Sequence, residues 1–152
     1  METTEKSVGV LNDLIEINND RIAGFAHAAK ELDNNDLDLK AIFETLSEES
    51  RGYVHELSSA VNINGEEPET GGSGTGAIHR AWIDVKATFT GHDRKSVLKE
   101  CERGEDAIKK AYKDALASDS GLSPEYFELL SRQQKGINAS HDKIKALRDS
   151  QV

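Results

Sequence analysis

Glu105 is the residue whose position most needs a chemical explanation. It lies in the stretch CERGEDAIKKAYKDAL, where residues recur at alternating steps of three and four, the spacing of one face of an amphipathic helix. A buried carboxylate costs several kcal/mol unless another group pairs with it. We therefore expect the fold to supply a partner for it. The predicted face consists of Leu98, Cys101, Glu105, Ile108, Tyr112 and Ala115.

The other long helical patterns also carry polar residues near their middle. Aligned helices would bring these positions to one height in the core, where donors could satisfy the Glu105 carboxylate. We expect His141, Tyr53 and Asn18 to supply those hydrogen bonds. The predicted buried polar cluster comprises Asn18, Ser50, Tyr53, Glu105, Asn138 and His141.

A metal ion is the alternative occupant of this layer. Glu105 and His141 would be the ligands of one zinc or iron ion, and Asp20 or Glu49 could join them if the helices rotate. Zinc sites normally use three or four protein ligands, so two make a sparse site. Asp20 and Glu49 are instead expected at the bundle edge, as solvated or capping charges.

Nothing else in the sequence favours catalysis, and we expect no catalytic residues. Cys101 lies on an apolar face and is expected to be a small core residue. No serine lies in a nucleophile elbow or against a base. The run GGSGTG lacks a preceding strand and a following Lys-Ser/Thr, which predicts a connection and not a phosphate loop. The remaining histidines form no His-x-x-x-His pair and are expected at surfaces or boundaries: His27, His55, His79 and His92.

Long amphipathic helices must position the polar residues. The apolar spacing predicts a first helix over residues 8–32 and a second over 39–60, with Asp36 as its N-cap and Asn64-Gly65 as its stop. Asp93 would cap the third helix, and Ser123 followed by proline opens the fourth. The buried face of that last helix is expected to contain Phe127, Leu130, Gln134, Ile137, His141 and Ile144.

A long connection separates the second helix from the third. It contains a flexible glycine-rich loop at about 63–76 and then AIHRAWIDVKATF, a predicted short helix anchored by Trp82. In a four-helix bundle, one such crossover makes the second and third helices parallel. The sequence therefore predicts an all-α fold, a single four-helix-bundle domain over residues 1–152.

The charge and composition of the chain bear on which classes of partner it can bind and on where it works. The net charge of −9 argues against a nucleic-acid-binding surface, which needs a basic face. A single cysteine excludes an internal disulfide and suits a reducing compartment. The first residues, METTEKSVGVLNDL, lack the basic segment followed by an apolar segment that marks a secretory signal peptide. No apolar run reaches the length of a transmembrane helix. We expect a cytoplasmic protein without a membrane or nucleic-acid partner.

A family resemblance covers nearly the whole chain and is carried by LNDLIEINND, SEESRGY, GAIHRAWIDVK, LKECERGEDAIKKAYKDAL and RQQKGINASHDKIKAL. Its most specific stretches are HRAW and ECERGED. By these segments the chain resembles the ferritin and rubrerythrin superfamily, and more closely a bacterial family of ferritin-like four-helix proteins of unknown function.

The superfamily resemblance implies a site pattern that this sequence keeps only in part. Di-iron members place a Glu on the first and third helices, each followed seven residues later by an aromatic residue, and Glu-x-x-His on the second and fourth. In this chain the third-helix Glu is Glu105, followed by Tyr112, and the last histidine is His141. The remaining ligand positions are Asn18 (with Phe25 in the aromatic place), Ser50, Tyr53 and Asn138.

Two of six ligands are therefore kept, and both bridging carboxylates are replaced by neutral residues. By this resemblance we expect a non-catalytic bundle with no cofactor, its degenerate di-iron site refilled by the polar cluster. Its role would lie in assembly, as in a homo-oligomer, in interaction with another protein, or in stress physiology. The alternative is a remnant metal protein that binds one ion through Glu105 and His141.

Overall fold

The computed structural model describes residues 2–32, 34–68, 94–117 and 120–151. Within these ranges every regular element is helical, which confirms the all-α prediction. The glycine-rich run from residue 69 onward, the predicted helix with Trp82 and the predicted cap Asp93 lie outside the described residues. The elements are α1 (Glu2–Glu31), η1 (Asn34–Asp36), α2 (Leu37–Ile63), α4 (Arg94–Ala115), η2 (Pro124–Tyr126) and α5 (Phe127–Asp149).

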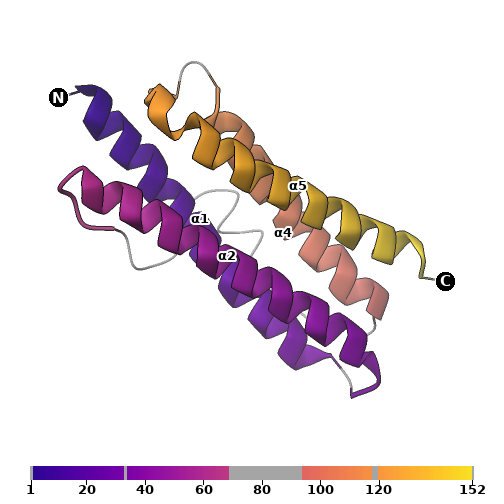
Figure 1. Cartoon of the computed structure of the whole chain (residues 1–152). Coiled ribbons are helices and arrows are strands. Elements are labelled where there is room, and N and C mark those ends of the chain that lie inside the picture. Colours follow the sequence, from indigo (N-terminus) through magenta and orange to yellow (C-terminus); the bar gives the residue numbers. More distant parts are fainter. Residues whose placement is uncertain (1, 33, 69–93, 118–119, 152) are drawn as a thin grey trace.

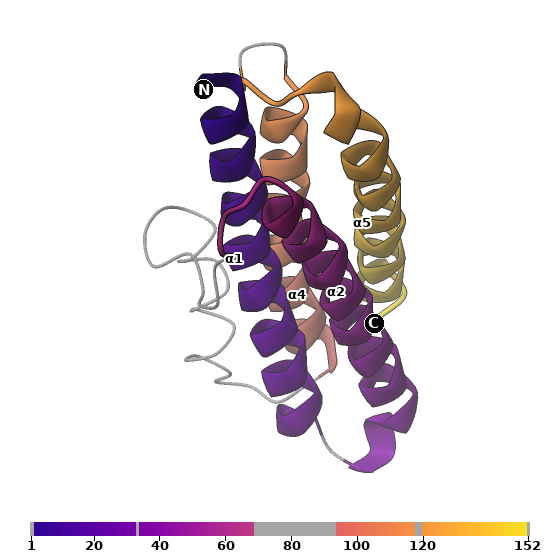
Figure 2. The same ribbon diagram turned by 60° about the vertical axis from the view of Figure 1, so that its left-hand side comes forward.

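The four long helices form two antiparallel hairpins, α1 with α2 and α4 with α5 (Figure 1). Arg94, at the start of α4, donates to Asp38 at the start of α2 over 2.6 Å. Arg132, near the start of α5, donates to Glu56 in the second half of α2 over 2.5 Å. These pairs make α2 parallel to α4 and antiparallel to α5, as the long connection predicted. Figure 2 shows the four helices running side by side.

The helix ends follow the predicted signals, and Asp36 and Ser123 occupy the predicted N-cap positions, but neither makes a side-chain cap hydrogen bond. Gly65 adopts a φ of 79°, the left-handed conformation that glycine adopts readily, directly after α2 ends. Asp36 precedes α2 but makes no side-chain cap hydrogen bond. Its carboxylate instead accepts from Arg94 at 3.0 Å. Ser123 makes no side-chain cap bond either, and its backbone N–H donates to Ser7 Oγ at 2.8 Å.

Two apolar clusters fill the bundle, one toward each end. The first gathers residues from the first half of α1 and from the second halves of α2 and α4, including Leu11, Leu57 and Ile108. The second gathers residues from the opposite halves, including Phe25, Phe43 and Leu98. Between them lies a layer of buried polar side chains. The residues of this layer on the four helices are Asn18, Arg21, Ser50, Glu105 and Gln133.

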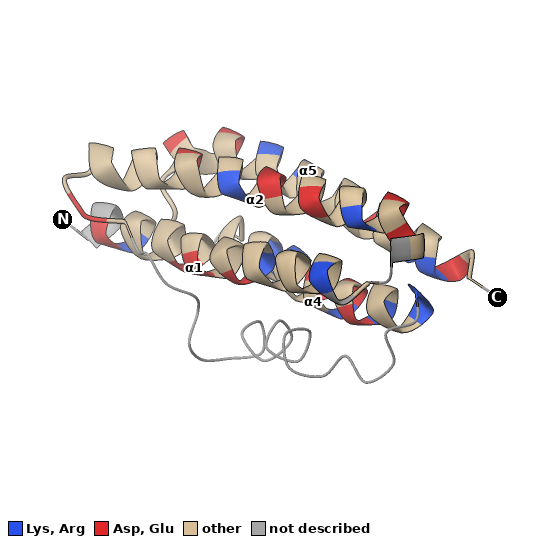
Figure 3. Ribbon diagram, turned by 90° about the horizontal axis from the view of Figure 1, so that it is seen from below, with Lys and Arg blue, Asp and Glu red and all other residues tan. Residues whose placement is uncertain are grey.

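The outer faces of the helices carry charges of both signs, which Figure 3 shows interspersed along the bundle. Acidic residues outnumber basic ones, 28 to 19. Within the described parts of the chain, none of the helices has the length and apolar character that crossing a membrane requires.

Candidate functional site

A buried ion pair lies at the centre of the polar layer. Arg21 reaches from α1 to Glu105 on α4, with Nε 2.7 Å from Oε1 and Nη2 3.0 Å from Oε2. Neither side chain is exposed, at 0% each. Two parallel N–H···O bonds give the bidentate geometry of the strongest arginine–carboxylate pairs. The donor to Glu105 is therefore Arg21, where the sequence had suggested His141, Tyr53 and Asn18.

The remaining nitrogen of Arg21 binds α2. Its Nη1 donates to Ser50 Oγ at 2.8 Å and to Glu49 Oε1 at 2.9 Å, with a longer contact of 3.4 Å to the backbone oxygen of Leu46. Glu49 also accepts from Ser140 Oγ on α5 at 3.1 Å. One guanidinium thus connects, directly or through Glu49, all four helices of the bundle.

Burial and pairing have opposite effects on the pKa values of Arg21 and Glu105. Burial by itself lowers the pKa of Arg21, but the charges and hydrogen bonds of Glu105 and Glu49 outweigh it and raise that pKa above its usual range. Burial raises the pKa of Glu105, and the charge and hydrogen bonds of Arg21 oppose that rise. Each buried charge is therefore tolerated because the other is present, so removing either one leaves the other uncompensated.

A chain of hydrogen bonds extends the layer toward the first apolar cluster. Ser50 Oγ donates to Asn18 Oδ1 at 2.8 Å, and Asn18 Nδ2 donates to Tyr112 Oη at 2.9 Å. Tyr112 Oη in turn donates to Gln133 Oε1 at 2.7 Å. Gln133 Nε2 donates to Glu56 Oε1 at 3.3 Å. Donors and acceptors alternate along this chain, so each buried polar group is satisfied.

Tyr53 lies at the close approach of α2 and α5. A Cβ atom added at Gly136 would fall 2.0 Å from Tyr53 Oη, so glycine is what leaves room for the phenol. Burial, and next the charge of Glu49, raise the pKa of Tyr53 to about 12. The phenol is therefore protonated at neutral pH, which makes it a poor metal ligand.

His141 and Asn138 lie outside the Arg21 network. The imidazole Nε2 of His141 is 2.5 Å from Asp106 Oδ1, and Nδ1 is 3.2 Å from Asp142 Oδ1. Asn138 is partly exposed and lines a surface groove between α4 and α5. The side chains that share this groove with it are Asp106, Lys109, Lys110, Lys113 and Gln134.

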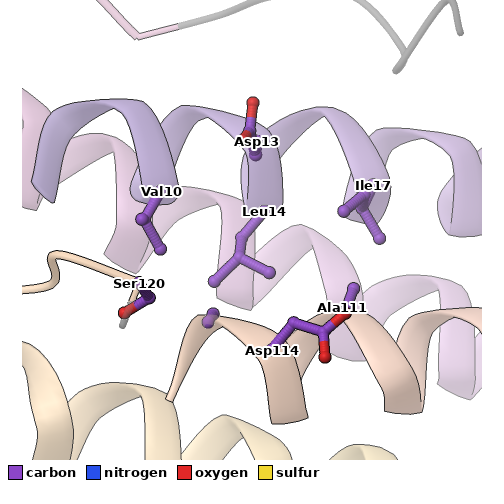
Figure 4. A pocket seen from close by; sticks show the side chains of 8 residues that line it. Val10, Asp13, Leu14, Ile17, Ala111, Asp114 and Ser120 are labelled. Carbon is purple, nitrogen blue, oxygen red and sulfur yellow. The ribbon is translucent and has the colours of Figure 1, made fainter. Parts of the chain in front are cut away.

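A shallow pocket between α1 and α4 offers no catalytic constellation. Figure 4 shows Leu14 pointing into it from α1, with Ala111 on the facing helix. Among the described residues that line it, the titratable ones are Asp13 and Asp114. The one hydroxyl among the described lining residues, Ser120, accepts a hydrogen bond from the backbone N–H of Leu122, and it has no histidine beside it in this lining. Two carboxylates and this hydroxyl on an apolar wall do not make a catalytic constellation.

Comparison with known proteins places this bundle in a family. The family described as Domain of unknown function (DUF2383) matches residues 6–118. The chain belongs to this family. No curated protein matches the sequence. A solved structure of a Dps1 mutant from Mycobacterium smegmatis superposes with a TM-score of 0.80 at 14% identity, covering 96% of this chain and 97% of that one. At that identity the likeness shows the fold, which is ferritin-like.

The side chains of this DUF2383 protein do not fit a ferritin-like di-iron centre. Two bridged irons need several carboxylates, and of the six positions that the superfamily resemblance implies as ligands only Glu105 carries one. Both of its oxygens are occupied by Arg21, whose positive charge already lies in the layer. A single ion held by Glu105 and His141 would likewise have to displace that guanidinium. The side chains of this layer therefore suit an internal ion pair.

The sequence pattern missed Arg21 and Gln133, for the same reason. Each lies one residue before a position that helical spacing favours for the buried face, Ile22 in the first helix and Gln134 in the last. In the structure Arg21 and Gln133 are buried, and Ile22 and Gln134 are partly exposed. Spacings of three and four are both helical, so Asn18–Arg21–Phe25 fits a buried face as well as Asn18–Ile22–Phe25 does. Hydrophobicity favoured Ile22, and the only signal for Arg21 was that a buried Glu105 needs a partner.

The two acidic residues expected at the bundle edge differ in their environments. Asp20 is 2% exposed, so it is not a solvated charge. Glu49 is 27% exposed but belongs to the Arg21 network. Cys101 is fully buried in the second apolar cluster, the place expected of a small core residue.

Proposed function

We propose that this DUF2383 protein is a non-catalytic ferritin-like bundle that acts through its surface, in assembly or in interaction with a protein partner. The observation that supports this most is the Arg21–Glu105 pair. In this bundle a side chain of the protein supplies the positive charge that a metal would supply in a di-iron relative. The layer then holds four helices in register and leaves no ligand set for oxygen or iron chemistry.

The proposal includes the domain organisation, the cellular location and the assembly that the sequence led us to expect. The chain would form one domain, work in the cytoplasm and assemble as a homo-oligomer, with a role in stress physiology suggested by fold analogy alone. Three large apolar side chains exposed on the described surface, Leu37, Ile63 and Phe127, are consistent with contacts to another chain. Light scattering on the purified full chain tests the oligomer, and a monomer at all concentrations would contradict it.

Iron loading tests the non-catalytic core. Protein purified without chelator is incubated anaerobically with excess Fe²⁺, desalted, and then exposed to air. We expect no di-iron centre and no oxidation of Fe²⁺ above the rate in buffer alone. The reason is that only one of the six ligand positions of the ferritin superfamily pattern carries a carboxylate here. About two irons per chain, lost in Glu105→Ala but kept in the surface variant Glu44→Gln, would overturn the proposal.

A further inference from the structure

A second group of polar side chains lies at the edge between α4 and α5, with partners of its own. One ligand atom from each of Glu102, Asp106 and His141 lies within 4.8 Å of the other two. Glu102 and Asp106 are one helical turn apart on α4, so their carboxylates share a face, and His141 approaches from α5. Neither Glu102 nor Asp106 is a position of the di-iron pattern.

Each ring nitrogen of His141 faces a carboxylate. Asp106 Oδ1 lies 2.5 Å from Nε2, and Asp142 Oδ1 lies 3.2 Å from Nδ1. Ionised carboxylates only accept hydrogen bonds, and a neutral imidazole has a single N–H. With Nδ1–H donating to Asp142, the lone pair of Nε2 would face another anion. Either a second proton or a metal ion at Nε2 removes this repulsion.

We propose that Glu102, Asp106 and His141 form a binding site for one divalent cation of the zinc class. One imidazole with two carboxylates is a ligand set that zinc accepts, with a fourth position for water. Magnesium and calcium prefer oxygen ligands throughout, which disfavours them here. Asp142 holds the Nδ1 side of the ring, the arrangement by which a carboxylate orients a metal-binding histidine. The site lies beyond the proposed structural core and does not depend on it.

Ion binding requires only local movement. Ligand bonds of about 2.0–2.2 Å keep neighbouring ligand atoms roughly 3 Å or more apart, so Asp106 and His141 must separate slightly. The Asp106 side chain is 61% exposed and moves without disturbing the core. Arg148 already pairs with Glu102 and competes for that carboxylate, so the ion must bind the other oxygen or displace the guanidinium.

Zinc titration of the full chain against a chromophoric chelator tests the site. We expect one zinc per chain, with affinity at least tenfold weaker in Asp106→Asn and in His141→Ala. Two control variants remove a like group outside the site and should bind as the wild type does: Asp114→Asn on the same helix, and His55→Ala on α2. Cobalt provides an independent spectrum, whose visible absorption should change in His141→Ala.

Circular dichroism without metal separates loss of a ligand from loss of the fold. Asp106→Asn replaces an exposed side chain by one of equal size, so it decides the question even if His141→Ala unfolds. No zinc bound at millimolar concentration would overturn the proposal. Zinc bound equally by the wild type and Asp106→Asn would overturn it as well, since the ion would then lie elsewhere.

Discussion

Arg21 and Glu105 form a bidentate ion pair in which neither side chain is exposed to solvent, joining α1 to α4 between the two apolar clusters. Glu49 and Ser50 on α2 complete the surroundings of the guanidinium. The fold is that of ferritin-like bundles, yet the positive charge in its core is covalently part of the chain. A buried ion pair of this kind adds specificity of packing more readily than net stability.

The close approach of Tyr53 and Gly136 predicts opposite effects of two glycine substitutions. In an exposed helix, alanine is more stable than glycine by about 1 kcal/mol. Gly52 has no atom within 4 Å of an added Cβ, so Gly52→Ala should stabilise the protein. Gly136→Ala should not, because its Cβ would lie 2.0 Å from Tyr53 Oη. Urea denaturation measures both.

Removing the obstructing hydroxyl provides the control. In a Tyr53→Phe background the nearest ring atom, Cζ, would lie 3.3 Å from the added Cβ, which removes the worst of the clash. Gly136→Ala should then regain part of the stability that it lacks in the wild type. If Gly136→Ala alone stabilises as much as Gly52→Ala does, the two helices do not approach as closely as described.

The pairing of Asp38 with Arg94 predicts a pH dependence. Hydrogen bonds from Arg94 lower the pKa of Asp38 from 3.8 to about 2. A carboxyl whose pKa is lowered by folding stabilises the fold above its unfolded pKa, and this contribution is lost as the pH falls from 3.8 toward 2. NMR titration of the Asp38 carboxyl should show the low value, and Arg94→Gln should return it to the ordinary range. The same pKa in Arg94→Gln and in the control Arg51→Gln would contradict the pairing.

Cys101 offers a readout of core integrity, since it is the only cysteine in the chain. Burial, and next the charge of Glu105, raise the pKa of its thiol well above the ordinary range. The thiolate is the reactive form, so a thiol reagent such as dithionitrobenzoate should modify the native protein far more slowly than protein in urea. Rapid modification of the native protein would show that the second apolar cluster is open.

The fold could be predicted from the sequence because helices are specified by apolar spacing and by end signals, which involve residues close together in the chain. The helices around Phe43 and Ile108 carry mostly apolar residues at helical spacing, and Asn64-Gly65 marks an end that the structure keeps. The parallel direction of α2 and α4 followed from the length of the connection between them. These features depend on neighbours a few residues apart, which a single sequence displays.

The partners within the polar layer depend on contacts between distant residues, and a single sequence shows these less well. Glu105 was expected to be buried and paired, and the structure buries it. Its partner Arg21 is 84 positions away, and apolar spacing gave that place to Ile22. The same holds for His141. Its spacing in the sequence indicates burial, but its contact with Asp106 depends on the packing of α5 against α4.

A double-mutant cycle between Arg21 and Glu105 tests the central claim most directly. Arg21→Met alone should destabilise the protein by about 3–5 kcal/mol, because it leaves a buried carboxylate without its partner. Arg21→Met with Glu105→Leu should recover much of that loss, with a coupling energy near the upper end of the usual range of about 0.5–3 kcal/mol. The surface pair of Arg51 and Glu48 is the control, and its coupling should stay below about 1 kcal/mol. Strictly additive effects of the Arg21 and Glu105 substitutions would contradict the account.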